Sequence, residues 1–257
     1  MDPFAVFSRV KEQPLDFLVS YGGFSRIFRT ICCIGDSLSS GEFEIVNEAG
    51  TTEYHDVYAQ SWGQYLARMN GATVYNCSRG GMSAQEYCDS FAEEMGYWDS
   101  RYSSQAYILA LGINELVFFD NIPLGTMDDV CLTDWHANKR TFAGYYGQII
   151  QRIQTDNPNT KVFLMTMPRS DQDTPKQQEA RNHHAALLHR FAALFPNTYV
   201  LDFHQYAPVF DERFRKLYFM RGHMNPCGYL LMAQMVASYL DYLIRTHMED
   251  FHEIGLV

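Results

Sequence analysis

Four polar segments of the chain carry residue types that together could perform acyl transfer. They are GDSLSSGE with Ser37, NCSRGGMS with Gly81, LGINEL with Asn114, and GHMNPCGY with His223. A serine can attack an ester carbonyl, a histidine can take its proton, and backbone or amide N–H groups can stabilise the oxyanion. These residue types predict a covalent hydrolytic site, provided that the fold brings them together.

Each segment taken alone is equally typical of ordinary structure. Asp-Ser before a helix is a common cap, a glycine pair makes a turn, and an asparagine often caps a helix. His223 lies two residues before Asn225 and Pro226, which read as the cap and first turn of a helix. Only a shared location in the fold can distinguish a catalytic site from a set of ordinary caps and turns.

The surrounding sequence alternates short apolar runs with longer helical patterns. We expect strands at 30–35, 72–76, 105–112, 161–168 and 198–203. We expect helices at 61–71, 83–95, 141–156, 175–195 and 226–245. Such alternation predicts an α/β fold in which helices cover both faces of a five-stranded parallel sheet. We expect an N-terminal extension at 1–29, forming a packed helix or an interface arm, one main domain at 30–247, and a tail at 248–257.

The four segments follow the expected strands in a consistent way. Ligands of open parallel sheets bind beyond the carboxyl ends of the strands. Ser37, Gly81 and Asn114 follow the first three strands, and His223 precedes the last helix. All four should therefore meet at one edge of the sheet. The connection at about 116–140 is long for its place between a strand and a helix, and loops of that length are often functional.

With these four blocks in this order, residues 30–245 resemble the SGNH hydrolases, also called GDSL esterases or lipases. The resemblance implies a three-layer, flavodoxin-like α/β/α sandwich that needs no metal or cofactor. It implies that Ser37 is the nucleophile and His223 the base. The oxyanion hole would consist of the Ser37 and Gly81 N–H groups and the Asn114 amide. Ser78 stands where the family often has glycine, and Glu115 where it usually has aspartate.

One position departs from the family pattern. The acid that usually lies three residues before the histidine is replaced by Met220. We therefore predict a Ser37–His223 dyad whose Nδ1–H donates to a main-chain oxygen of residues 218–221. The alternative is an acid from elsewhere, with Asp120 and Glu115 as the candidates.

The composition of the chain argues against several classes of binding partner. The net charge is −10 with no basic run, which argues against nucleic acid and anionic membranes. We see no apolar stretch long enough to span a bilayer and no secretory signal at the N-terminus. Six cysteines without metal-site spacing indicate reduced thiols, so we expect a cytoplasmic protein. The oligomeric state is left open.

Two other groups of residues suggest a ligand. His183, His184 and His189 are not spaced at i, i+4, which disfavours a metal hydrolase. Aromatic residues near the expected edge could form sugar platforms or core: Trp62, Tyr75, Trp98, Phe118, Phe119 and Trp135. With the family resemblance, and without an apolar lid, we expect small acyl esters, chiefly acetyl groups on carbohydrates. The alternatives are a lysophospholipase or thioesterase of the same superfamily, and an inactive binding module with this fold.

Overall fold

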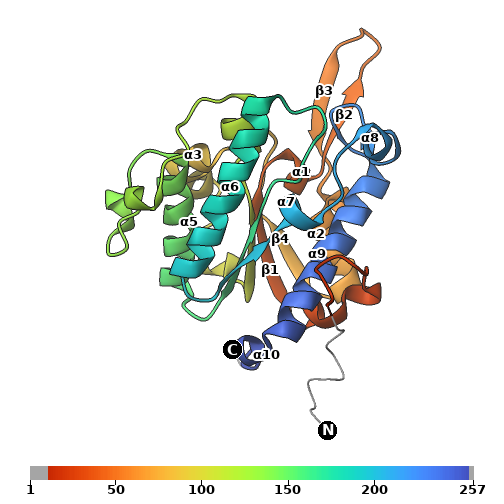
Figure 1. Ribbon diagram of the computed structural model, residues 1–257. Coiled ribbons are helices and arrows are strands. Elements are labelled where there is room, and N and C mark those ends of the chain that lie inside the picture. The colour runs from red at the N-terminus through yellow and green to blue at the C-terminus, as the bar shows by residue number, and fades with distance from the viewer. Residues whose placement is uncertain (1–10, 255–257) are drawn as a thin grey trace.

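The computed structural model describes residues 11–254, and a five-stranded parallel sheet forms its centre (Figure 1). Its strands are β1 (Thr30–Gly35), β4 (Thr73–Asn76), β5 (Ala106–Ala110), β6 (Lys161–Met165) and β7 (Thr198–Leu201), in the order β4-β1-β5-β6-β7. The predicted class, strand number and parallel pairing are confirmed. Three strands end earlier than predicted, at Ala110, Met165 and Leu201.

Long helices cover both faces of this sheet (Figure 1). One face carries α2 (Trp62–Asn70) and α9 (Pro226–Thr246), and the other carries α5 (Phe142–Asp156) and α6 (Pro175–Leu194). Each of the four helices begins after a polar residue whose side chain accepts a backbone N–H, which offsets the unpaired donors of the first turn: Ser61, Asn225, Thr141 and Thr174. The predicted helix at 83–95 is interrupted: α3 (Ala84–Glu86) and α4 (Ala92–Glu94) flank a π-helical turn.

The sheet separates two hydrophobic cores. Cys33 belongs to the core shared with α2 and α9, whereas its neighbour Cys32 belongs to the core shared with α5 and α6. Side chains of a strand alternate between faces, so adjacent buried cysteines show that β1 is covered on both faces, and it pairs with β4 on one side and β5 on the other. Each layer thus buries its apolar face against the same sheet, which gives the three-layer sandwich.

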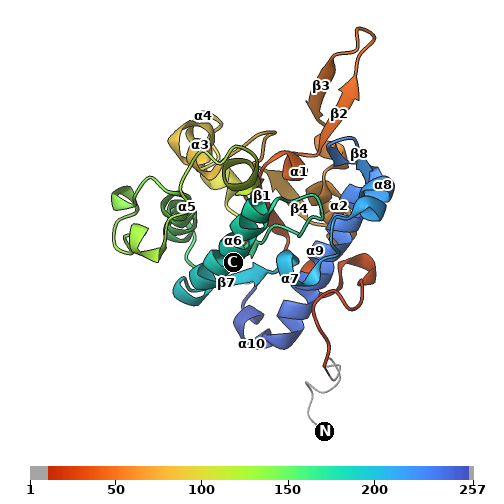
Figure 2. The ribbon, with the colours of Figure 1, turned by 45° about the horizontal axis from the view of Figure 1, so that its top comes forward.

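Several elements lie outside the predicted alternation. The chain after β1 forms a single helical turn, α1 (Ser37–Ser40), and then a hairpin of β2 (Glu42–Val46) and β3 (Thr52–Asp56). This hairpin projects from the body (Figure 2). Before the last helix come α7 (Phe203–Tyr206), α8 (Glu212–Tyr218), β8 (Phe219–Met220) and β9 (His223–Met224), and after it comes α10 (Met248–Phe251).

The described part of the N-terminal segment packs on the body. A short 3₁₀ segment, Ser20–Ile27, lies against α9, where the Phe24 N–H donates to Asp241 Oδ1 at 2.7 Å. Residues 1–10 and 255–257 lie outside the described residues, so the division of the chain into an extension, a domain and a tail stays a prediction.

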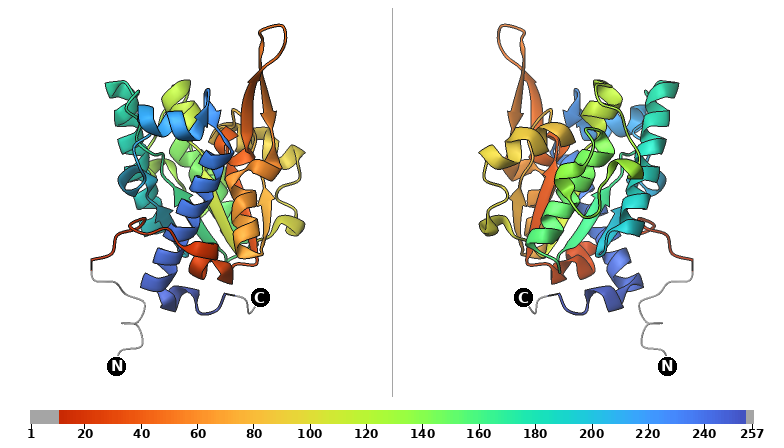
Figure 3. Two further views of the ribbon diagram at one scale, coloured as in Figure 1. Left: turned by 90° about the vertical axis from the view of Figure 1, so that its right-hand side faces the viewer. Right: turned by 90° about the vertical axis from the view of Figure 1, so that its left-hand side faces the viewer.

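One helix passes a length-and-composition test for crossing a membrane, which differs from the expectation that no segment would. That helix is α9, but 67% of its most apolar 18-residue window is buried inside the protein. A helix that packs along the central sheet, as α9 does in the left-hand view of Figure 3, can have the same apolar character as a membrane-spanning helix.

Candidate active site

Ser37 lies at the carboxyl end of the central strand β1. Asp36 caps the following turn by accepting the Leu38 N–H at 3.0 Å, and Ser37 is the first residue of α1. Gly35 allows this sharp exit, because a Cβ at that position would clash with Ser39 Oγ. Ser37 is half-buried. Ser37 therefore lies at the end of the first strand, where the sequence predicts it.

Burial dominates the charge state of Asp36. Its side chain is only 4% exposed, and desolvation raises its pKa from 3.8 to about 7, although the bond from Leu38 N lowers it. The charge of Glu115 raises it further. A buried carboxyl that titrates near neutrality thus directly precedes the candidate nucleophile.

The loop after β4 reaches the same edge from the neighbouring strand. Cys77 N and Ser78 Oγ both donate to the Cys33 carbonyl, at 2.8 and 3.1 Å, which fixes the start of the loop against β1. Gly81 has φ +72°, a left-handed conformation that favours glycine, and no atom lies within 4 Å of the place where its Cβ would be. The loop therefore presents open backbone at Gly81.

Asn114 approaches that loop from the other side of β1. It begins a π-helical turn, Asn114–Phe118, after β5, and its Nδ2 donates to the Met82 carbonyl at 2.9 Å. An amide nitrogen carries two hydrogens, so this bond orients the group and leaves a second hydrogen for a ligand. The neighbouring Glu115 accepts the Ala84 N–H at 2.7 Å, so both residues tie the two loops together.

His223 is held at the mouth of the last helix, as its sequence context predicts. Asn225 caps α9 by accepting the Gly228 N–H at 2.9 Å, and Pro226 is the first helical residue. His223 lies on β9, which pairs with Met220 on β8 and packs against both α1 and β2. Its side chain is 16% exposed.

Two carboxylates of β2 surround the His223 ring. Glu42 Oε1 lies 2.9 Å from Nε2, and Glu44 Oε2 lies 3.7 Å from Nδ1. The Tyr54 ring of β3 packs edge-on against the imidazole, with 5.9 Å between ring centroids. Burial lowers the pKa of His223, whereas the nearby charges of Glu44 and Asp56 raise it.

The prediction that His223 Nδ1–H donates to a main-chain oxygen of residues 218–221 is wrong. Nδ1 has no hydrogen-bond partner among the described residues, which include all of 218–221. The two acids named as substitutes also lie elsewhere: Asp120 is exposed and pairs with Lys176, and Glu115 binds Ala84 N. No hydrogen bond or ion pair joins either of them to His223 in the described part of the chain.

The acids beside His223 were missed because no strand was expected between 36 and 60, where the structure has β2 and β3. The sequence did contain a signal, since Glu42-Phe43-Glu44 alternates with the two-residue period of a strand and puts both carboxylates on one face. Ser37 Oγ forms no hydrogen bond to His223 in residues 11–254, so the predicted proton transfer between them stays a prediction. The roles of Gly81 and Asn114 stay predictions as well.

The histidines and aromatic residues that the sequence suggested as ligand groups do not form one site. Among residues 11–254, no three His, Cys, Asp or Glu side chains lie close enough to hold a metal ion. His184 is buried against the Leu111 carbonyl, and His189 pairs with Asp202. Of the aromatic residues, Trp62 is core, whereas Phe118 and Phe119 are more than 60% exposed.

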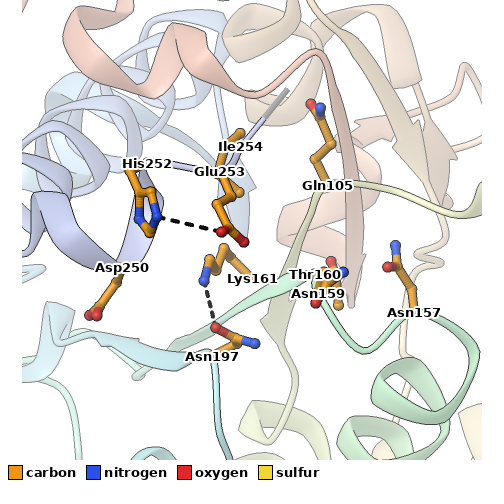
Figure 4. A pocket seen from close by; sticks show the side chains of 10 residues that line it. All are labelled: Gln105, Asn157, Asn159, Thr160, Lys161, Asn197, Asp250, His252, Glu253 and Ile254. Atoms are coloured by element: carbon orange, nitrogen blue, oxygen red, sulfur yellow. Dashed lines mark hydrogen bonds and ion pairs between the residues drawn. The ribbon is translucent and has the colours of Figure 1, made fainter. Parts of the chain in front are cut away.

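A cavity of about 420 Å³ lies at the opposite end of the sheet (Figure 4). It opens between the starts of β5 and β6 and the C-terminal segment, and its lining is mostly polar. Lys161 Nζ crosses part of it to donate to Asn197 Oδ1 at 2.5 Å. None of the four sequence blocks contributes to this cavity, so it plays no part in the candidate active site.

Comparison with solved structures supports this fold assignment. A protein from Lactobacillus plantarum has 17% identity and a TM-score of 0.60, covering 84% of this chain and 97% of its own. A family two carbohydrate esterase from Clostridium thermocellum, in complex with cellohexaose, has 16% identity and a TM-score of 0.56, covering 86% of this chain and 65% of its own. Est24, a carbohydrate acetylesterase from Sinorhizobium meliloti, has 12% identity and a TM-score of 0.54, covering 84% and 99%. At these identities the likeness shows the SGNH-hydrolase fold.

The family itself is shown by the sequence. No curated protein matches the chain. Residues 33–231 do match a family of hydrolases, and the match contains all four blocks that the fold brings to the carboxyl edge of the sheet. The chain therefore belongs to the GDSL-like Lipase/Acylhydrolase family and is a carboxylic ester hydrolase.

Proposed function

We propose that the protein is a serine esterase that removes small acyl groups, chiefly acetyl, from carbohydrates. The observation that carries this proposal is the convergence of three loops around the end of β1. Ser37 follows β1 directly, Gly81 presents open backbone beside it, and the Asn114 amide is oriented by the Met82 carbonyl. This is the set of groups that acyl transfer requires.

In the proposed reaction, His223 takes the proton of Ser37 as Oγ attacks the ester carbonyl. The N–H groups of Ser37 and Gly81, with the Asn114 amide, bind the oxyanion of the tetrahedral intermediate. His223 then gives its proton to the leaving alcohol, which breaks the ester bond and leaves an acyl-enzyme. Water, deprotonated by His223, attacks that acyl group; the acyl–Oγ bond then breaks, His223 returns the proton to Ser37 Oγ, and the carboxylic acid leaves.

The substrate class rests on two supports. Two of the solved structures with this fold are named as carbohydrate esterases, one of them with cellohexaose and the other as an acetylesterase. The exposed aromatic side chains of Phe118 and Phe119 lie four and five residues after Asn114, and such rings can pack on sugar faces. We also propose a cytoplasmic location, because all six cysteines are unbridged.

The test is a hydrolysis screen with nitrophenyl esters from acetate to decanoate, beside acetylated sugars and oligosaccharides. Wild type should cleave acetate esters faster than octanoate, and Ser37→Ala should remove the activity while keeping the thermal unfolding temperature. A preference for long chains would favour a lysophospholipase or thioesterase. Absence of hydrolysis with retained oligosaccharide binding would favour a binding module, and full activity of Ser37→Ala would refute the nucleophile.

A further inference from the structure

The base of the β2–β3 hairpin lies against the turn that carries His223 (Figure 2). Glu44 Oε2 accepts the Gly222 N–H at 2.8 Å, so this carboxylate is fixed to the residue next to His223. The same oxygen lies 3.7 Å from His223 Nδ1. The hairpin therefore places an anchored negative charge beside the ring nitrogen for which the family's usual acid is missing.

The buried Nδ1 needs an acceptor in the tautomer that leaves Nε2 free to act as the base, because Nδ1 then carries the ring hydrogen. It is shielded from solvent and has no hydrogen-bond partner in the described structure. A buried N–H without an acceptor is costly, and an imidazole base needs one nitrogen bound so that the other presents its lone pair to the nucleophile. Met220, at the family's acid position, has only a thioether to offer, whereas Glu44 offers an oxygen already in place.

Glu42 is on the other side of the ring. Its Oε1 lies 2.9 Å from Nε2, and its Oε2 lies so close to Gly80 that a Cβ there would clash with it. Glu42 thus occupies the space between His223 and the loop that presents Gly81. Nε2 has a single hydrogen-bonding position, so the Glu42 carboxylate must move away from it before Nε2 can accept the proton of Ser37.

Taking this as a deeper account of the proposed esterase, we propose that Glu44 is the positioning residue for His223. Its carboxylate accepts Nδ1–H and so completes a Ser37–His223–Glu44 triad whose acid comes from the hairpin. The distance must shorten by about 0.8 Å to reach an ordinary N–H···O length of about 2.9 Å. Catalytic hydrogen bonds are often long in the free enzyme and tighten when substrate binds.

The decisive variant is Glu44→Gln, because it keeps an oxygen for the Gly222 N–H and removes the charge. The matched control is Glu53→Gln on β3 of the same hairpin, where Glu53 accepts from Asn47 and pairs with His55, away from His223. Activity on nitrophenyl acetate should fall at least about tenfold in kcat for E44Q, with KM little changed. Loss of a triad acid's charge can cost up to about 10⁴. E53Q should stay within about twofold of wild type, as expected for a surface substitution.

A second measurement separates positioning from simple support of the loop. The three carboxylates that face His223 are Glu42 and Glu44 from β2 and Asp56 from β3. Removing the charge of Glu44 should lower the pKa of His223, both in an NMR titration of the imidazole and in the acid limb of the kcat/KM profile. Substitution of a residue that only supported the loop would leave both the imidazole titration and the acid limb of the kcat/KM profile unchanged.

The outcomes are distinguishable. If wild type cleaves no ester, the proposed function fails and this inference fails with it. If wild type is active but E44Q matches E53Q in kcat and in the His223 titration, the inference alone fails. If Glu42→Gln gives both effects and E44Q gives neither, the acid is Glu42 and the ring works in the reverse orientation, which also overturns the proposal.

Discussion

Asp36 should make the stability of this protein fall as the pH rises through neutrality. Its carboxyl is buried at the cap of α1, and its pKa is raised from 3.8 to about 7, chiefly by desolvation. Between these two values the folded protein holds a proton that the unfolded chain has released. The stability that this proton contributes is fully present below pH 3.8 and is lost as the pH rises through about 7.

The size of the effect follows from the two pKa values. They differ by about three pH units, and each unit corresponds to about 1.4 kcal/mol, so the upper limit is about 4 kcal/mol. Asp36→Asn keeps the oxygen that caps Leu38 N and cannot ionise. The free energy of unfolding of the variant, minus that of wild type, should therefore increase by up to about 4 kcal/mol between about pH 4 and pH 8.

Urea unfolding followed by tryptophan fluorescence at a series of pH values measures this difference. Any constant cost of the new amide cancels, because only the change with pH is compared. Asp99→Asn is the matched control, since Asp99 caps a short helix through Arg101 N but is half-exposed. The curve of unfolding free energy against pH for Asp99→Asn should stay parallel to that of wild type. If the curve for Asp36→Asn also stays parallel to that of wild type, Asp36 is not a buried carboxyl that titrates near neutrality.

Three further outcomes are expected. Asn114→Ala should lower kcat on nitrophenyl acetate by about 10²–10³, or about 3–4 kcal/mol, because an oxyanion donor acts in the transition state; a rise in KM alone would make Asn114 a ground-state contact. Met220→Ala should cost less than about tenfold in kcat/KM, because its exposed thioether offers the base no acceptor; a larger loss would give its side chain a role in orienting His223. His223→Ala should be as damaging as Ser37→Ala, because the pair acts as a unit; substantial residual turnover in His223→Ala would assign the base elsewhere.

The sheet and its flanking helices were predictable because their signals are local. Apolar runs such as 30–35 bury both faces of a strand, and polar caps such as Ser61 and Asn225 mark where helices begin. The edge positions of Ser37, Gly81 and Asn114 then follow from the general geometry of parallel sheets. These parts of the site need no knowledge of tertiary contacts.

The environment of His223 was not predictable in the same way. It depends on a hairpin that folds back across the chain, bringing Glu44 to Gly222 over a separation of 178 residues. Nothing in the sequence near Met220 encodes that contact. The residues near His223 therefore predicted a main-chain oxygen as the acceptor of its Nδ1–H. The interruption of the helix at 83–95 by a π turn is likewise a product of packing, which propensity alone does not reveal.

The most direct test of the account is covalent labelling of the nucleophile. A fluorophosphonate probe reacts with a serine whose hydroxyl is activated by a base and whose adduct is held by an oxyanion hole. Peptide mass spectrometry of the labelled wild-type protein should find the phosphonyl group on Ser37, and the label should be lost in His223→Ala. A label on another serine, or no label on a protein that hydrolyses acetate esters, would contradict the assignment of Ser37 and the mechanism built on it.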